Sequence, residues 1–276
     1  VAIRAGRLIS PIWLYSQQID VGYTYPWVRL PPEVYGLNTI KSVNGVSFLA
    51  EKRIGAGVLQ AEILAGSNRN GSQLKTRGAE SDYDTIIQNF VGADLRYIWG
   101  EHLTLRAAYN QADANVQVGT RLNLPAGTIT GVNAPTYVTI PTVLDANRAR
   151  FLSLGLKSEF EDFFLVGEYA RRWIRGSALA RASGFYGSLG RNFGKLSAYG
   201  LFAWRGDLEG TLRPHPLSPT VTTLLLKMTS WGGGVNYQLH ENVVLKTELL
   251  RSEHSYQDPS RSFSFYNFLF SADFIF

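Results

Sequence analysis

The last positions of the chain alternate between a wholly apolar set and a mixed set that contains the polar residues. One set of alternate positions consists of Tyr266, Phe268, Phe270, Ala272, Phe274 and Phe276. The other set consists of Asn267, Leu269, Ser271, Asp273 and Ile275, and so carries an acid and an amide. Side chains two residues apart share one face of a strand, so one face is wholly apolar. Such a strand is a poor edge for a soluble sheet, because exposed apolar edges aggregate. The pattern predicts a strand of a transmembrane β-barrel, apolar toward lipid and polar toward a lumen.

The same alternation recurs along the whole chain, and short polar or Gly-containing turns join the runs in pairs. The predicted strands cover residues 1–8, 45–53, 57–67, 85–99, 102–114, 147–160, 163–175, 180–193, 195–206, 224–239, 242–256 and 261–276. The connections at the other ends are mostly long and polar, over 68–84, 115–146 and 207–223, whereas 257–260 is shorter and 177–179 is an exception. Short turns on one side and long loops on the other are typical of bacterial outer-membrane barrels. The alternative is a soluble all-β sandwich, which rarely sorts its loops in this way.

Aromatic residues are expected to mark both rims of the predicted wall. Trp99, Phe160 and Phe193 precede short turns, whereas Trp173, Trp204 and Trp231 lie toward the long loops. Amphipathic rings gather at both interfaces of a barrel in a bilayer. We therefore expect all six on the lipid-facing side.

Composition agrees with a membrane barrel. The chain has 276 residues, no Cys and one Met, and its mean hydropathy is −0.07. It contains no run of about 18 apolar residues, the length that a transmembrane helix needs. The absence of Cys fits export through an oxidising compartment. The first residues, VAIRAGRL, do not form a signal peptide, so we expect a processed form or a chain that begins inside a longer protein.

One connection differs from the others. Residues 9–43 are rich in aromatic residues and Pro, and contain SPIWLYSQQIDVGYTYPWVRLPPEVYGLNTIKSV. An ordinary surface loop is polar and rich in Gly and Ser, whereas this one carries enough apolar surface to pack. We interpret it as an inward-folded constriction loop that narrows a pore. The alternatives are a cap on the outside and a contact with a neighbouring subunit.

This segment also carries a resemblance. The stretch 6–35 resembles the pattern GRL-x-x-P-x-x-LYS followed by DVGY-x-YPWVR-x-P-x-EVY, found in gammaproteobacterial porin-like proteins of the outer membrane. The matching positions are Gly6, Arg7, Leu8, Pro11, Leu14, Tyr15, Ser16, Asp20, Val21, Gly22, Tyr23, Tyr25, Pro26, Trp27, Val28, Arg29, one of Pro31 and Pro32, Glu33, Val34 and Tyr35.

The resemblance implies an architecture and an assembly. In porins the constriction loop follows the fifth of sixteen strands, and eleven predicted strands follow this segment. We therefore expect one all-β domain over 1–276, an antiparallel up-and-down transmembrane β-barrel. About twelve strands of a sixteen-stranded porin would be present, with about four N-terminal strands lacking. Porins resembling this chain are commonly trimers, so a homotrimer is implied.

The predicted inward positions supply candidate pore-lining charges. Together with the constriction segment, they give the candidate set Arg4, Arg7, Asp20, Arg29, Glu33, Arg53, Arg96, Arg106, Lys157, Glu168, Arg172, Arg205 and Lys246. Further inward acids are Glu51, Glu62, Asp94, Glu159, Glu248 and Asp273. Fixed charges in a narrow aqueous pore set ion preference, and the formal net charge of +5 favours a weak preference for anions. We expect Asp20 and Glu33 to face a basic wall that includes Arg4, Arg96 and Arg106.

These observations predict a passive diffusion channel for small hydrophilic solutes in the bacterial outer membrane. The alternatives are a substrate-specific channel for an anion or organic acid and a lipid-acting outer-membrane enzyme. Of the four His residues only His254 lies on a predicted strand, near Ser252 and Ser255, without the His-x-Ser-Asn-Gly pattern of the outer-membrane phospholipase. Nucleophile-elbow, zinc-protease, P-loop and metal-ligand spacings are absent, so no enzyme, cofactor or metal is predicted.

The expected partners follow from the charge distribution. Lys and Arg are spread over both faces of the strands, which argues against nucleic acid. Arg148, Arg150 and Arg171 lean outward near the outer rim, where anionic lipopolysaccharide would be a counter-charge. Outer-membrane lipid, lipopolysaccharide, small hydrophilic solutes and further copies of the chain are therefore the predicted partners.

Overall fold

The computed structural model describes residues 1–38, 40–76, 79–124, 136–175, 181–208, 226–256 and 259–275. Its strands are β1 (Ala2–Ile9), β2 (Ser42–Ile54), β3 (Gly57–Thr76), β4 (Ala79–Trp99), β5 (Leu103–Leu124), β6 (Thr136–Phe160), β7 (Phe163–Arg175), β8 (Arg181–Phe193), β9 (Leu196–Leu208), β10 (Leu226–His240), β11 (Val243–Tyr256) and β12 (Phe263–Phe274). The short helices are η1 (Ser16–Gln18), η2 (Gly22–Thr24), α1 (Pro32–Tyr35) and η4 (Pro259–Arg261).

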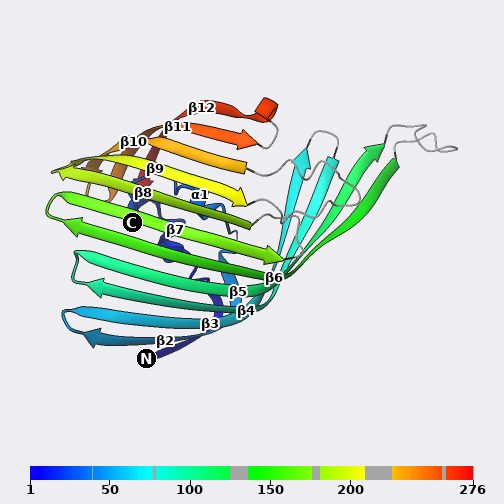
Figure 1. Ribbon diagram of the computed structural model, residues 1–276, viewed down its shortest axis with the longest axis horizontal. Coiled ribbons are helices and arrows are strands. Elements are labelled where there is room, and N and C mark those ends of the chain that lie inside the picture. The colour runs from blue at the N-terminus through cyan, green and yellow to red at the C-terminus, as the bar shows by residue number, and fades with distance from the viewer. Residues whose placement is uncertain are drawn as a thin grey trace.

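The twelve strands form one antiparallel sheet in strict chain order, from β1 to β12. Figure 1 shows this sheet as a curved wall, with α1 behind β8 and β9 on the inner side of the curve. The predicted all-β, up-and-down antiparallel class is therefore confirmed. β1 and β12 are the two edges of the sheet in this order.

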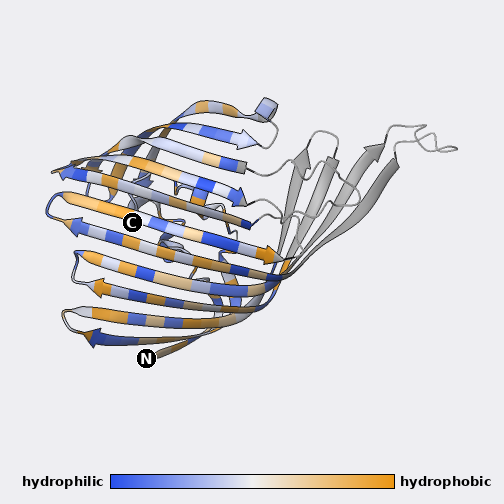
Figure 2. Ribbon diagram, viewed as in Figure 1, coloured by the Kyte–Doolittle hydropathy of each residue, from blue (hydrophilic) through white to orange (hydrophobic). Residues whose placement is uncertain are grey.

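Alternation sets the two faces of the wall, as the sequence predicted. On β2, Ser47 is fully buried inside, whereas its neighbours Val46 and Phe48 are about half exposed on the outside. On β12, Phe268 is 72% exposed while the adjacent Asn267 and Leu269 turn inward. Figure 2 shows the resulting alternation of apolar and polar residues along the strands. The outward positions are thus mainly apolar, whereas the inward positions carry the polar and charged residues together with apolar ones such as Leu64.

Aromatic side chains lie on the outward face near the strand ends. Trp99, Phe160 and Phe193 are each about half exposed or more beside the short turns. Trp231, toward the opposite ends, is 49% exposed. Two separated levels of outward rings fit the two interfaces of a bilayer.

Two of the predicted long loops are largely strand. The β3–β4 ladder continues to the pair Thr76 and Ala79, and the β5–β6 ladder continues to Leu124 and Thr136. The expected loops 68–84 and 115–146 were therefore too long, and Figure 1 shows β3–β6 running past the other strands. The polar sequence of these stretches predicts loops, but strands that need not face lipid can be polar on both sides. The predicted connection 207–223 falls mostly outside the described residues.

Register shifts accompany this extension. They occur at Gly66–Asn68, Gln88–Val91 and Ala112–Ala114, on the adjacent pairs β3–β4, β4–β5 and β5–β6. An extra residue in one strand raises the local twist and bends the ladder. Asn89, at the middle shift, has a φ of 51°. The bulges therefore mark the level at which the extended strands leave the common wall.

Candidate functional site

The connection between β1 and β2, residues 10–41, lies against the inner face of the sheet; we call it the inner segment. Its side chains Ile12, Trp27 and Val34 are completely buried. They form one apolar cluster with inward residues of the wall, which include Phe151, Val166, Ala170, Ala182, Tyr186, Tyr199, Leu201, Ala203 and Leu250. Burial of this aromatic surface is the main apolar contribution to holding the segment. The segment thus covers the inner side of β6–β11.

Aromatic rings give the inner segment a rigid interior. Trp13 meets Phe151 of β6 edge-on, with ring centroids 4.6 Å apart. Trp27 meets Tyr186 of β8 edge-on at 5.1 Å, and also contacts Tyr15 at 5.9 Å. Such geometries are favoured by the ring quadrupoles. The rings of the segment therefore interlock with those of the wall.

The start of the inner segment is held by a buried charge cluster. The Leu14 amide donates to a Glu168 carboxylate oxygen of β7 at 2.8 Å. Arg106 of β5 lies 2.5 Å from Asp94 of β4 and 3.9 Å from Glu168, and donates to the Ile12 carbonyl at 3.2 Å. Buried charges are tolerated only when paired and hydrogen-bonded. These contacts therefore anchor the segment to β5 and β7, and Asp94 of β4 holds Arg106 in place.

Tyr35 closes the space next to this cluster. Its ring centroid lies 5.0 Å from that of Trp13, and the Tyr15 amide donates to its hydroxyl at 3.4 Å. Burial, reinforced by nearby Glu168, raises the pKa of the Tyr35 hydroxyl well above its ordinary value. The hydroxyl therefore stays protonated at neutral pH and acts as a neutral hydrogen-bonding group.

The middle of the inner segment is held by Lys246 of β11. Its ammonium donates to the carbonyl oxygens of Gly22 and Tyr25 at 2.6 Å each and of Trp27 at 3.2 Å. The same group forms a 2.9 Å ion pair with Asp273 of β12. Three backbone acceptors and one carboxylate use every donor of a Lys side chain. The cation therefore fixes the loop conformation instead of facing open solvent.

Helix α1 is held by a third group of contacts. The hydroxyl of Ser230 on β10 donates to the Glu33 carboxylate and lies 2.9 Å from the hydroxyl of Ser252 on β11. A Cβ on Gly184 of β8 would lie 2.5 Å from the Glu33 carbonyl oxygen. The missing side chain at position 184 therefore allows α1 to approach the wall closely. Arg172 of β7 donates to the Leu37 carbonyl at 2.8 Å, just after the helix.

The structure separates the predicted pore-lining charges into two groups. Several are covered by the inner segment and hold it in place, namely Glu33, Arg106, Glu168 and Lys246, together with the partly covered Arg172. Others remain at least partly exposed on the inner side, namely Arg4, Asp20, Arg29, Arg53, Arg96 and Lys157. Arg205 is largely engaged by Asp207, at 3.0 and 3.2 Å. Only the uncovered group can meet a solute in solution.

Two expectations about individual residues were wrong. Arg7 pairs with Asn44 in the β1–β2 register and lies on the outward face, opposite to Arg4, because three residues along a strand reverse the side. Glu33 does not face Arg4, Arg96 and Arg106, since its side chain is buried against Ser230. Asp20 is exposed and pairs with Lys41 of its own segment at 2.7 Å. The expected opposition of two acids to a basic wall is therefore not present.

Small polar residues hold the inner segment and were missed in the sequence. Ser153 of β6 donates to the Ile12 carbonyl, and Asn236 of β10 donates to that of Pro26 at 2.9 Å. Ser230 donates in the same way to Glu33 of α1, and Gly184 leaves room for that helix to approach the wall. The available signal was a small or polar residue at an inward position, but alternation alone does not reveal which of these lies under a loop.

Two further kinds of site concern metal ions and membrane-spanning helices. Within these ranges no group of three or more His, Asp or Glu side chains is arranged to hold a metal ion. Over the same part of the chain, no helix has both the length and the apolar character needed to cross a membrane.

Comparisons with known proteins add one likeness. No protein-family model matches the chain, and no curated protein matches it. Among solved structures, the chain is similar to "Outer-membrane expressed OmpT of Vibrio cholerae", with 10% sequence identity and a TM-score of 0.38. The alignment covers 84% of this chain and 89% of that chain.

Proposed function

We propose that this protein is an outer-membrane diffusion channel for small hydrophilic solutes, narrowed by the inner segment. The observation that carries the proposal is the position of residues 10–41 against the inner face of a wall that is apolar outside. An apolar outward face with aromatic rings at two levels supports a bilayer environment. A polar inward face that is only partly covered supports an aqueous path beside the segment.

The uncovered inward charges are proposed to set the ion preference of this path. The cations Arg4, Arg53 and Arg96 lie on β1, β2 and β4, on the part of the wall that the apolar cluster of the inner segment does not reach. Inward acids of the same region include Glu51, whose carboxylate accepts a 2.9 Å hydrogen bond from Gln60. Glu62 of β3 is a further uncovered inward acid, so the basic and acidic groups of this region nearly cancel, and the anion preference that we propose is weak.

The closure of the sheet into a barrel and the assembly of several copies of the chain are further parts of the proposal. A sheet with two unpaired edges cannot be exposed to lipid, because backbone groups must be hydrogen-bonded there. We propose that the sheet closes into a barrel in the membrane, so that neither β1 nor β12 presents an open edge to lipid. The predicted homotrimer would use flat parts of the outer wall such as Gly187, where a Cβ would meet nothing within 4 Å. A heat-modifiable trimer band on a semi-native gel would support that assembly, and a monomer in mild detergent would contradict it.

Single-channel recording in planar bilayers tests the function and its alternatives together. Large ohmic steps support the general channel. Small steps blocked by one anion or organic acid would favour the substrate-specific channel. Absence of steps combined with lipid hydrolysis in the same preparation would favour the lipid-acting enzyme and would overturn the proposal.

A further inference from the structure

Both ends of the inner segment line a small pocket. Its volume is about 210 Å³, and its described lining residues come from 10–19, which we call the first limb, and from 35–41, the second limb. The Ser10 amide donates to the Lys41 carbonyl oxygen at 2.9 Å and so joins the two limbs. Among the described residues, the pocket is therefore formed by the inner segment itself.

The walls of this pocket are largely apolar and held in place. The rings of Trp13 on the first limb and Tyr35 on the second have their centroids 5.0 Å apart. Ile19 and Ile40 also line the pocket and are partly exposed. The Ser16 hydroxyl accepts a 2.7 Å hydrogen bond from the Trp13 amide, so it fixes the backbone of the first limb. Sites for small molecules are typically lined in this way, with a few polar groups beside apolar walls.

Two opposite charges lie at the rim of the pocket. Lys41 lines the pocket, and its ammonium forms a 2.7 Å ion pair with Asp20. The two side chains are 60% and 74% exposed, so water screens the pair and holds it only weakly together. Both groups can turn toward a solute without leaving a buried charge behind. The pocket therefore offers one cation and one anion next to apolar walls.

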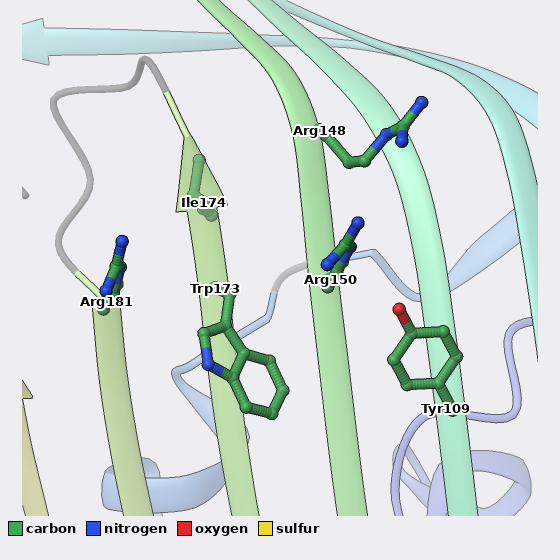
Figure 3. Close-up of a pocket in the computed structure, with 6 residues that line it drawn as sticks. All are labelled: Tyr109, Arg148, Arg150, Trp173, Ile174 and Arg181. Carbon is green, nitrogen blue, oxygen red and sulfur yellow. The ribbon is translucent and has the colours of Figure 1, made fainter.

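A second cavity has a different chemistry and lies on the outer wall. Its volume is about 380 Å³, and Figure 3 shows Trp173 between Arg150 and Arg181 at this cavity. None of its described lining residues is acidic. Arg150 and Trp173 are paired across the β6–β7 ladder on the outward face. A solute inside the lumen meets the pocket of the inner segment and does not meet this outer cavity.

We propose that the pocket of the inner segment binds a free α-amino acid with an apolar side chain. The side chain enters between the two limbs, the α-carboxylate faces Lys41 and the α-ammonium faces Asp20. An apolar cavity of about 150 Å³ holds a benzene ring, so this pocket suits a side chain of the size of leucine or phenylalanine. The proposal rests on the proposed function, which brings solutes into the lumen, and it names one class of solute that is held beside the path.

The ion pair at the rim is the reason for choosing a zwitterion. A carboxylate alone would displace Asp20 from Lys41 and would then be repelled by it, and a lone ammonium would meet the same difficulty with Lys41. A zwitterion supplies an opposite charge to both groups at once. Its two charges and its side chain therefore match the three features of the pocket.

Saturation-transfer NMR on the protein in detergent micelles, with empty micelles as the blank, measures the affinity of four probes. L-phenylalanine carries all three groups, 3-phenylpropionate lacks the ammonium, phenethylamine lacks the carboxylate and glycine lacks the ring. Phenylalanine should bind about threefold to fivefold more tightly than either singly charged probe, which is the contribution of an exposed ionic contact. Glycine should bind at least about tenfold more weakly than phenylalanine, because no ring is buried.

Variants place the binding in the pocket. Ile40→Trp fills the space between the limbs and should weaken phenylalanine binding about tenfold or more. Ile3→Trp, on the outward face of β1, is the matched control and should leave the binding unchanged. Lys41→Gln should weaken phenylalanine binding about threefold to fivefold without weakening that of phenethylamine.

Each other outcome also decides the matter. Binding of 3-phenylpropionate or glycine as tight as that of phenylalanine, or equal binding by the two Trp variants, would overturn the proposal. If Ile40→Trp does not fold, Lys41→Gln and the four probes on the unchanged protein decide. Channel recording on the same preparation reports the proposed function separately. Ohmic steps without phenylalanine binding would overturn the amino-acid site alone, and binding without steps would overturn the channel alone.

Discussion

The ammonium group of Lys246 donates a 2.6 Å hydrogen bond to the carbonyl oxygen of Tyr25, more than two hundred residues earlier in the chain. A cation on a barrel wall would ordinarily be assigned to the pore. Here it holds backbone of the inner segment, and Asp273 balances its charge at 2.9 Å. Inward direction alone therefore does not make a residue pore-lining, because the segment decides which inward groups meet solvent.

Lys246→Met should lower the free energy of unfolding by roughly 3 kcal/mol, because three backbone acceptors and the Asp273 carboxylate lose their partner. Urea unfolding in micelles, followed by tryptophan fluorescence, measures this change. The control is Lys157→Met, on the same face, whose ion pair with Glu159 is 39% and 52% exposed. That change should cost under about 1 kcal/mol. Equal losses in the two variants would contradict the anchoring role of Lys246.

Glu168→Gln should destabilise the start of the inner segment by about 1–3 kcal/mol. The neutral amide is a weaker acceptor for the Leu14 amide, and it leaves Asp94 as the one charged partner of Arg106 among the described residues. Hydrogen exchange of the Leu14 amide should therefore speed up. Glu51→Gln is the control, because Glu51 is exposed and bonds only to Gln60 among the described contacts. Unchanged exchange at Leu14 would sink the prediction.

Gly184→Val should push α1 away from the wall, because a Cβ at this position meets the Glu33 carbonyl oxygen at 2.5 Å. Overpacking of this kind costs about 1–3 kcal/mol. Single-channel recordings should show a changed conductance with more flicker. Gly200→Val on the neighbouring strand β9 is the control, since a Cβ there would meet only the Gly232 carbonyl oxygen, at 3.8 Å. The reasoning would be wrong if both variants behaved like the wild type.

Arg53→Gln should shift the channel toward cations. Arg53 is an exposed, inward cation, and one charge at about 7 Å from an ion in water contributes roughly 0.6 kcal/mol, a factor of about two to three in the permeability ratio. The reversal potential in a salt gradient measures this ratio. Lys52→Gln removes the same charge from the outward face of the same strand and should leave the ratio unchanged. A shift in the control alone would contradict the assignment of faces.

Alternation in the sequence predicted the strands and their faces well, because lipid and lumen impose opposite demands on neighbouring residues. Asp273 and Phe274 follow this rule on β12. The same rule places both Glu62 and Glu168 on the inward face. The inner segment covers Glu168, however, and leaves Glu62 partly exposed. Cover depends on how the inner segment folds across strands distant in sequence, and no periodicity encodes that. Gly184 is informative only once α1 is known to lie against it.

The most direct test of the central claim is the conductance of a channel modified inside the proposed path. The chain has no Cys, so Arg29→Cys introduces a unique thiol on the exposed side of the inner segment. Single-channel current is recorded before and after addition of a negatively charged methanethiosulfonate reagent, with Val46→Cys on the outward face as the control. The account predicts a stepwise fall in current for Arg29→Cys and no change for Val46→Cys. Unchanged current after verified modification at position 29 would contradict the claim that the inner segment narrows the channel.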